Sequence, residues 1–140
     1  MKLFAQLATA AAAAVSCKIG LLSNFTYAPF VHFSLDRLDI NKHFNAIVIS
    51  EENGWRKPSP CIFKDILDRL HITDVADVVY VGDSPLEDIK GAKSVGFKTV
   101  FVSSQFHSLK NLVESNISAD FTAKNLYEVS VILNQIIQNR

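Results

Sequence analysis

The sequence predicts an α/β fold in which helices pack against an open parallel sheet. Short runs of apolar residues recur along the chain, at residues 19–22, 46–49, 78–81 and 99–102. Continuous apolar runs of this length are typical of parallel strands that are buried on both faces. Segments with helical periodicity separate the runs, and strands that alternate with helices indicate an α/β sheet.

The helical segments are expected at residues 30–38, 60–71 and 85–95. The second of them carries an apolar face made of Ile62, Phe63, Ile66, Leu67 and Leu70. Ser59 can cap the helix that Pro60 opens, and Gly96 stands where the third helix should end. Near the C-terminus, residues 119–122 predict a short edge strand and residues 126–137 a final packed helix, because their apolar residues recur at helical spacing.

Composition favours one compact domain over residues 18–140, since the 140-residue chain is 49% hydrophobic and 20% charged. Its formal net charge of zero gives no general attraction to nucleic acid or to an anionic membrane, so neither is an expected partner. Cys17 and Cys61 show no metal-ligand spacing, and we expect free thiols in a cytoplasmic protein.

Residues 1–17 allow two interpretations. The stretch after Lys2 is rich in alanine, which has the highest helix propensity, and it is followed at once by the first strand. An N-terminal helix is therefore preferred. The alternative is a secretory signal, which the charge and the apolar length of the stretch also allow. The segment is too short to span a bilayer, which takes about 20 apolar residues.

Polar residues stand directly after the apolar runs, where an open parallel sheet binds its ligands. Ser23 and Asn24 end the first run, the second leads through a short loop to Lys57, and Asp83 and Asp88 follow the third. A hydroxyl can hydrogen-bond a phosphate oxygen, an ammonium can neutralise developing charge, and carboxylates can hold a hard cation. Together these residues predict a site for phosphoryl chemistry.

Three segments resemble motifs of the haloacid dehalogenase-like (HAD) hydrolase superfamily. They are LLSNF for the second motif, GWRKPSPCIF for the third and VYVGDSPLEDIKGAKSVGFKTVFV for the fourth. The resemblance covers nearly all of residues 18–102 and implies a Rossmann-like sheet between two layers of helices.

The resemblance also implies roles for individual residues. Ser23 would bind the transferred phosphoryl group, and Lys57 would steady both nucleophile and phosphate. Asp83 would bind Mg²⁺ directly, and Asp88 either directly or through water and the lysine. Asn24 would contact the ligand or shape the turn.

The fourth motif resembles that of the Mg²⁺-dependent phosphatases rather than that of the metal-independent dehalogenases. The implied activity is hydrolysis of a small phosphorylated metabolite, with Lys57 and Asp83 in catalytic roles. The segment between Ser50 and Lys57 is too short for a large cap domain. The chain therefore does not predict which substrate is selected.

The nucleophile of the family has no counterpart. No acidic residue precedes Asp36, and Asp36 and Asp39 follow the Ser23 strand, in or at the end of a surface helix. The strand that carries the nucleophile would lie in the middle of the family's sheet, so the sheet should be interrupted between the strands that end at Ser23 and Asp83. Asp83 and Asp88 alone should hold Mg²⁺ weakly.

Three explanations stay open: an incomplete gene product, a split protein completed by a partner or by self-association, and a degenerate relative. The prediction is a HAD-like phosphate-ester hydrolase that is inactive by itself. The alternative is a non-catalytic module that binds phosphate or takes part in assembly.

Overall fold

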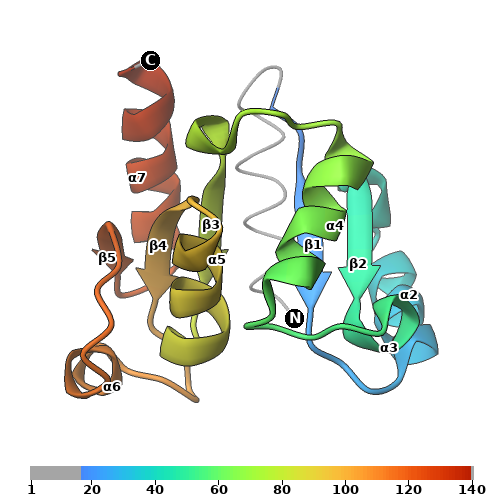
Figure 1. Cartoon of the computed structure of the whole chain (residues 1–140), viewed down its shortest axis with the longest axis horizontal. Helices are drawn as coiled ribbons and strands as arrows, with labels where there is room; N and C mark the ends of the chain where they lie inside the picture. Colours follow the sequence, from blue (N-terminus) through green and yellow to red (C-terminus); the bar gives the residue numbers. More distant parts are fainter. Residues whose placement is uncertain (1–16, 140) are drawn as a thin grey trace. The chain divides into compact units, whose positions relative to one another are not determined.

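The computed structural model describes residues 17–139, and the chain divides into two compact units. The N-terminal unit ends at Ile72 and the C-terminal unit begins at Thr73. Of the predicted N-terminal segment, all but Cys17 lies outside the described residues. The single domain predicted over residues 18–140 stays a prediction, and each unit is described by itself (Figure 1).

The N-terminal unit is a two-stranded parallel sheet with helices. Gly20 pairs with Ala46 and Ser23 with Ile49, so the two strands end together. In chain order the elements are β1 (Gly20–Ser23), α2 (Ala28–Arg37), the 3-10 turn η1 (Asn41–His43), β2 (Ala46–Ile49), α3 (Ser50–Asn53) and α4 (Pro60–Leu70).

Helix α4 packs against the strands through the face that the sequence predicted. Ile62, Phe63, Ile66 and Leu67 are buried. The Ser59 side chain caps the helix by accepting a hydrogen bond from the Cys61 N–H at 3.3 Å. A Cβ added at Gly20 would lie 2.7 Å from Ile66 Cδ1. Glycine at this position therefore allows α4 to lie directly on the backbone of β1.

Helix α2 covers the opposite face of the same sheet. Leu21 packs with Leu35 and Ile40 in a core that also includes Ile47. Since alternate strand residues face opposite sides, Leu21 points away from the face that Gly20 presents to α4. The N-terminal unit thus has a helix–sheet–helix arrangement, which can be followed in Figure 1.

The C-terminal unit contains a three-stranded parallel sheet in the order β3-β4-β5. Its elements are the 3-10 turn η2 (Val75–Asp77), β3 (Val79–Gly82), the π-helical segment η3 (Pro85–Lys90), α5 (Gly91–Ser94), β4 (Lys98–Val102), α6 (Leu109–Glu114), β5 (Phe121–Ala123) and α7 (Leu126–Gln138).

Strand β4 lies in the centre of this sheet and is the most buried strand. Val100 and Phe101 are fully buried, and Phe101 packs with Ile89 and Leu112. Strand β3, by contrast, is half-buried at every residue. The expectation that it is buried on both faces is wrong, because β3 is an edge strand with one hydrogen-bonded neighbour.

The parallel sheet is interrupted where the sequence predicted. Among residues 17–139, β1 and β2 form one sheet and β3, β4 and β5 another, with no ladder that joins the two. Strands β1 and β3 are the ones that end at Ser23 and just before Asp83.

Within residues 17–139, no helix is both long and apolar enough to cross a lipid bilayer.

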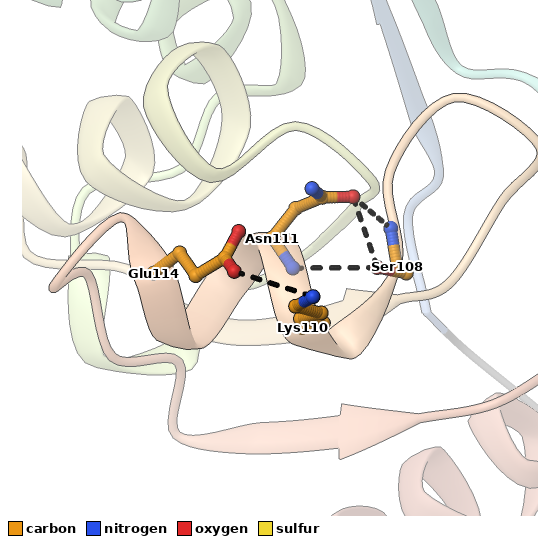
Figure 2. Close-up of polar contacts among 4 residues, drawn as sticks. All are labelled: Ser108, Lys110, Asn111 and Glu114. Carbon is orange, nitrogen blue, oxygen red and sulfur yellow. Dashed lines mark hydrogen bonds and ion pairs between the residues drawn. The ribbon is translucent and has the colours of Figure 1, made fainter.

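Two short helices, α3 and α6, were not expected from the sequence. Helix α6 begins with a capping box, in which the Ser108 hydroxyl accepts from the Asn111 N–H and Asn111 Oδ1 accepts from the Ser108 N–H at 2.8 Å (Figure 2). Lys110 and Glu114 form an exposed ion pair one turn apart, at 3.7 Å. Helices of four to six residues are too short to show an apolar periodicity.

Candidate active site

The polar residues at the end of β1 hold the loop that carries Lys57. The Asn24 side chain donates from Nδ2 to the Lys57 carbonyl at 3.0 Å and accepts at Oδ1 from the Lys57 N–H at 2.8 Å. Both backbone groups of Lys57 are therefore bound by one side chain. Ser23, which the sequence placed beside Lys57, is joined to it through its neighbour Asn24.

Lys57 is unusually buried for a lysine, with 9% of its surface exposed. It is followed by a cis peptide bond to Pro58 and by a turn in which the Ser59 N–H donates to the Arg56 carbonyl at 2.9 Å. Helix α4 begins immediately after this turn. The position of the Lys57 backbone is thus fixed by Asn24 on one side and by a capped helix on the other.

The Ser23 hydroxyl has no hydrogen-bond partner within residues 17–139. Ser23 is the last residue of β1 and is half-buried. A serine in a structural role at a strand end would bond a nearby backbone group. This hydroxyl makes no such bond.

Ser50 is a further polar residue of this region that sequence reasoning missed. Its hydroxyl accepts from the Phe25 N–H at 3.0 Å and donates to the Phe25 carbonyl at 3.1 Å. The next residue, Glu51, accepts a short hydrogen bond from the Ala28 N–H at the start of α2. The loop after β1 is therefore fastened to the residues that follow β2.

In the C-terminal unit, Asp88 organises the loop that follows β3. Its side chain is 4% exposed. Oδ2 accepts from the N–H groups of Asp83 and Ser84, both at 3.0 Å, and Oδ1 accepts from the Tyr80 hydroxyl, also at 3.0 Å. Since a carboxylate has about four acceptor positions, most of them are occupied by these contacts. Asp88 holds the backbone of Asp83 in place.

Gly82 is required for this close approach. A Cβ at this position would lie 2.5 Å from the Cβ, the Cγ and the Oδ2 of Asp88. No side chain fits at that distance without a shift of the loop. The glycine of the fourth motif is thus explained by packing against Asp88.

Tyr80 is the donor on the other side of Asp88. Burial raises the pKa of the Tyr80 hydroxyl well above its ordinary value, and the negative charge of Asp88 raises it further. The phenol therefore remains a neutral hydrogen-bond donor at neutral pH. Tyr80 was not singled out from the sequence. The available signal was a tyrosine within an apolar strand, because a buried tyrosine hydroxyl needs a hydrogen-bond partner.

The Asp83 carboxylate is held by a residue from the segment after β4. Ser104 Oγ donates to Asp83 Oδ2 at 2.6 Å. Nothing in the sequence pattern singled out Ser104, because it lies 21 residues from Asp83 in a loop without periodicity.

The described residues offer a partial set of ligands for a magnesium ion. No group of three or more His, Cys, Asp or Glu residues that could hold a metal occurs within residues 17–139. Magnesium usually keeps several waters and binds one or two carboxylates together with substrate phosphate. Asp83, with Asp88 beside it, fits that mode of binding.

Asp36 and Asp39 lie where the sequence predicted and take no part in these contacts. Asp36 is exposed on α2, and Asp39 follows the helix with a positive φ of 56°. The Lys42 ammonium, 2.6 Å away, holds the pKa of the Asp39 carboxyl below its ordinary value. That neither residue serves as the nucleophile stays a prediction.

Comparison with known proteins identifies the family. A family model described as HAD-hydrolase-like matches residues 54–129, which is more than half of the chain. The chain belongs to the HAD-like hydrolases. This HAD-like chain therefore has the family that its three motifs predicted, and its helix-covered parallel sheets have the fold expected for that family.

The glyceraldehyde 3-phosphate phosphatase of Pyrococcus abyssi is 43% identical to this HAD-like chain over 65 residues, which cover 46% of the chain and 27% of the relative. The pyrimidine 5'-nucleotidase YjjG of Escherichia coli is 28% identical over 118 residues, which cover 84% and 50%. The chain thus spans between about a quarter and a half of the curated relatives it matches.

The fold has counterparts among solved structures. One is the putative HAD-hydrolase YfnB of Bacillus subtilis, whose crystal structure contains bound magnesium. It superposes with a TM-score of 0.73 at 20% identity and covers 91% of this chain and 53% of that one. At this identity the likeness concerns the fold alone.

Proposed function

We propose that this HAD-like chain contributes the phosphate and cation ligands of a Mg²⁺-dependent site that hydrolyses small phosphate esters. Ser23 and Lys57 bind the phosphate, and Asp83 and Asp88 form the Mg²⁺ side. The observation that carries the proposal is the buried Lys57, whose two backbone groups are bound by the residue that follows Ser23. Such an arrangement has a cost in desolvation that a surface lysine does not have.

On the phosphate side, the hydroxyl of Ser23 donates to a phosphate oxygen and the Lys57 ammonium neutralises its charge. Preorganised donors of this kind stabilise a charge that develops in the transition state without further reorganisation. We assign Asn24 to the positioning of Lys57, because its amide is bound to the Lys57 backbone. This assignment favours the turn role of Asn24 over direct contact with the ligand.

On the cation side, a bound Mg²⁺ supplies positive charge that neutralises and orients the phosphate. Asp83 is the direct ligand. Asp88 acts mainly by fixing the Asp83 and Ser84 N–H groups, since both donate their hydrogen bonds to its Oδ2. The YfnB structure, which has the same fold, contains bound magnesium.

The activities named for the relatives support phosphate esters as the substrate class. One relative is a glyceraldehyde 3-phosphate phosphatase and the other a pyrimidine 5'-nucleotidase. The identical segments cover only part of each relative, so the proposal extends to the class of ester and not to either compound.

The source of the nucleophile distinguishes the hydrolase from a second candidate function, a non-catalytic module that binds phosphate. Sequence order and exposure place both Asp36 and Asp39 outside the predicted site, and no acidic residue precedes them. A non-catalytic module that binds phosphate would need Ser23 and Lys57 but no nucleophile. A catalytic site would need an aspartate from another polypeptide segment.

Two measurements on the purified chain distinguish these functions. The first is Mg²⁺-dependent hydrolysis of p-nitrophenyl phosphate, and the second is binding of inorganic phosphate followed by ³¹P NMR. Lys57→Ala and Asp83→Asn are compared with Lys64→Ala, which removes an exposed lysine of α4.

Turnover that both site variants lose and Lys64→Ala retains would establish the hydrolase. Phosphate binding without turnover, lost in Lys57→Ala, would establish the phosphate ligands and show that the chain alone acts as a binding module. Phosphate binding that is equal in the wild type and Lys57→Ala would contradict the proposed site.

A further inference from the structure

Within residues 17–139, the hydrogen-bond partner of the Asp83 carboxylate is the Ser104 hydroxyl, which lies outside the fourth motif. Ser104 lies in the loop between β4 and α6 and is half-buried. Its Oγ accepts from the N–H groups of Phe106 at 3.1 Å and His107 at 3.2 Å, and it donates to Asp83 Oδ2 at 2.6 Å.

These contacts determine the direction of the hydroxyl proton. A serine hydroxyl has one proton to donate and two lone pairs that accept. Because the Phe106 and His107 N–H groups occupy the lone pairs, the proton is directed to Asp83. A hydroxyl that donates to a carboxylate at this distance forms a strong, charge-assisted hydrogen bond.

The loop that carries Ser104 is itself fixed at both ends. At its start, the Ser103 N–H donates to the Ala123 carbonyl of β5 at 3.0 Å. Within the loop, the Ser104 N–H donates to the His107 carbonyl at 2.9 Å. At its end, the capping box of α6 holds Ser108 (Figure 2). Ser104 is thus presented by a short turn with little freedom to move.

Asp83 is consequently held at two points. Its backbone N–H is bound to Asp88 and its Oδ2 to Ser104. Oδ1 makes no hydrogen bond within residues 17–139. The carboxylate therefore has one oxygen engaged by the protein and one available.

We propose that Ser104 is a positioning residue, which fixes Asp83 Oδ2 so that Oδ1 is the oxygen that binds the divalent cation. The inference rests on the proposed Mg²⁺ role of Asp83. It adds a residue outside the three motifs and assigns separate tasks to the two oxygens of one carboxylate. Groups that hydrogen-bond a metal ligand usually control both its orientation and the affinity for the metal.

The test compares Ser104→Ala with Ser104→Thr, which retains a hydroxyl, and with Ser103→Ala. The last variant removes a neighbouring hydroxyl that has no contact with Asp83. The first readout is the χ1 rotamer distribution of Asp83, from three-bond NMR couplings without metal. The second is the Mg²⁺ affinity, from a titration followed at the Asp83 carboxyl ¹³C signal.

We expect one Asp83 rotamer in the wild type, Ser104→Thr and Ser103→Ala, and several rotamers in Ser104→Ala. The Mg²⁺ affinity should fall about tenfold in Ser104→Ala, the lower end of the effect of losing a group that orients a metal ligand. A role limited to loop stability would lower the melting temperature and leave both readouts unchanged.

The two ways in which the inference can fail are distinguishable. If the wild type gives no Mg²⁺ response at Asp83, the proposed cation site is wrong and the positioning role falls with it. If the wild type responds and Ser104→Ala has the same affinity and the same rotamer, Ser104 is not a positioning residue and the proposed function stands.

Discussion

Replacing Asp88 by alanine removes the acceptor that organises the loop after β3. The change leaves three donors without this partner: the N–H groups of Asp83 and Ser84 and the hydroxyl of Tyr80. A buried donor that loses its partner costs about 1–3 kcal/mol. Water that enters the vacated space recovers part of this cost.

We therefore expect Asp88→Ala to lower the free energy of unfolding by about 3–5 kcal/mol, the range for removing one partner of a buried charged network. Asp88→Asn should cost less, about 1–2 kcal/mol. The amide oxygen can still accept from both N–H groups, and its NH₂ can donate to the Tyr80 oxygen. Tyr80→Phe removes one of the three hydrogen bonds and should cost a similar amount.

Urea unfolding followed by circular dichroism, in buffer without divalent cations, measures these differences. A common m-value for the variants would indicate that stability has changed rather than the unfolded state. Glu114→Ala is the control, since it removes an exposed carboxylate whose ion pair with Lys110 contributes about 0–1 kcal/mol.

Two results would refute the reasoning. If Asp88→Ala were as stable as Glu114→Ala, the Asp88 network would not hold the loop. If Asp88→Ala cost no more than Tyr80→Phe, the contacts to the two backbone N–H groups would contribute nothing.

Three further predictions concern neighbouring residues. Asn24→Ala should cost about 1–3 kcal/mol in urea unfolding and weaken inorganic phosphate binding, because the backbone of Lys57 loses both contacts; unchanged binding by ³¹P NMR would contradict this. Gly82→Ala should lower stability by about 1–3 kcal/mol, since the new methyl group would collide with Asp88; a thermal midpoint equal to that of the wild type would show that the loop yields freely. Stability should also fall as pH rises above about 10, the ordinary pKa of tyrosine, because the raised pKa of Tyr80 makes the folded state hold its proton while the unfolded state loses it. Tyr80→Phe should lack this part of the decline when urea midpoints are compared between about pH 8 and 11, and an identical decline would place its origin elsewhere.

Local signals in the sequence were sufficient for most of the regular elements. Strand β2 and the start of α4 match their predicted bounds, because an apolar run and a capped proline are both read from adjacent residues. The half-buried state of β3 depends on how many strands flank it, which is not a local property. The first two residues of α2 were not predicted, since the helix begins at Ala28 and the expected helix began at residue 30.

The order of the candidate site residues along the chain is evident from the sequence, and their hydrogen bonds are not. Ser23 and Asp83 stand at or directly after the end of a strand, and Lys57 follows β2 after a short segment. The partners Ser104 and Ser50 were not predicted, since each acts on a residue 21 or more positions away through a single hydroxyl. A lone serine in a loop has no pattern that distinguishes such a contact from exposure to solvent.

Beyond the end of β1, the Asn24 amide takes the place of a paired strand by hydrogen-bonding a backbone. It hydrogen-bonds both the N–H and the C=O of Lys57, 33 positions along the chain. These are the two backbone contacts that one more residue pair of a sheet would make. The registration of Lys57 against β1 is consequently independent of the length of chain between them. Insertions in the exposed turns around α2 would add little to the entropy cost of closing the loop. They would leave the two hydrogen bonds between Asn24 and Lys57 intact.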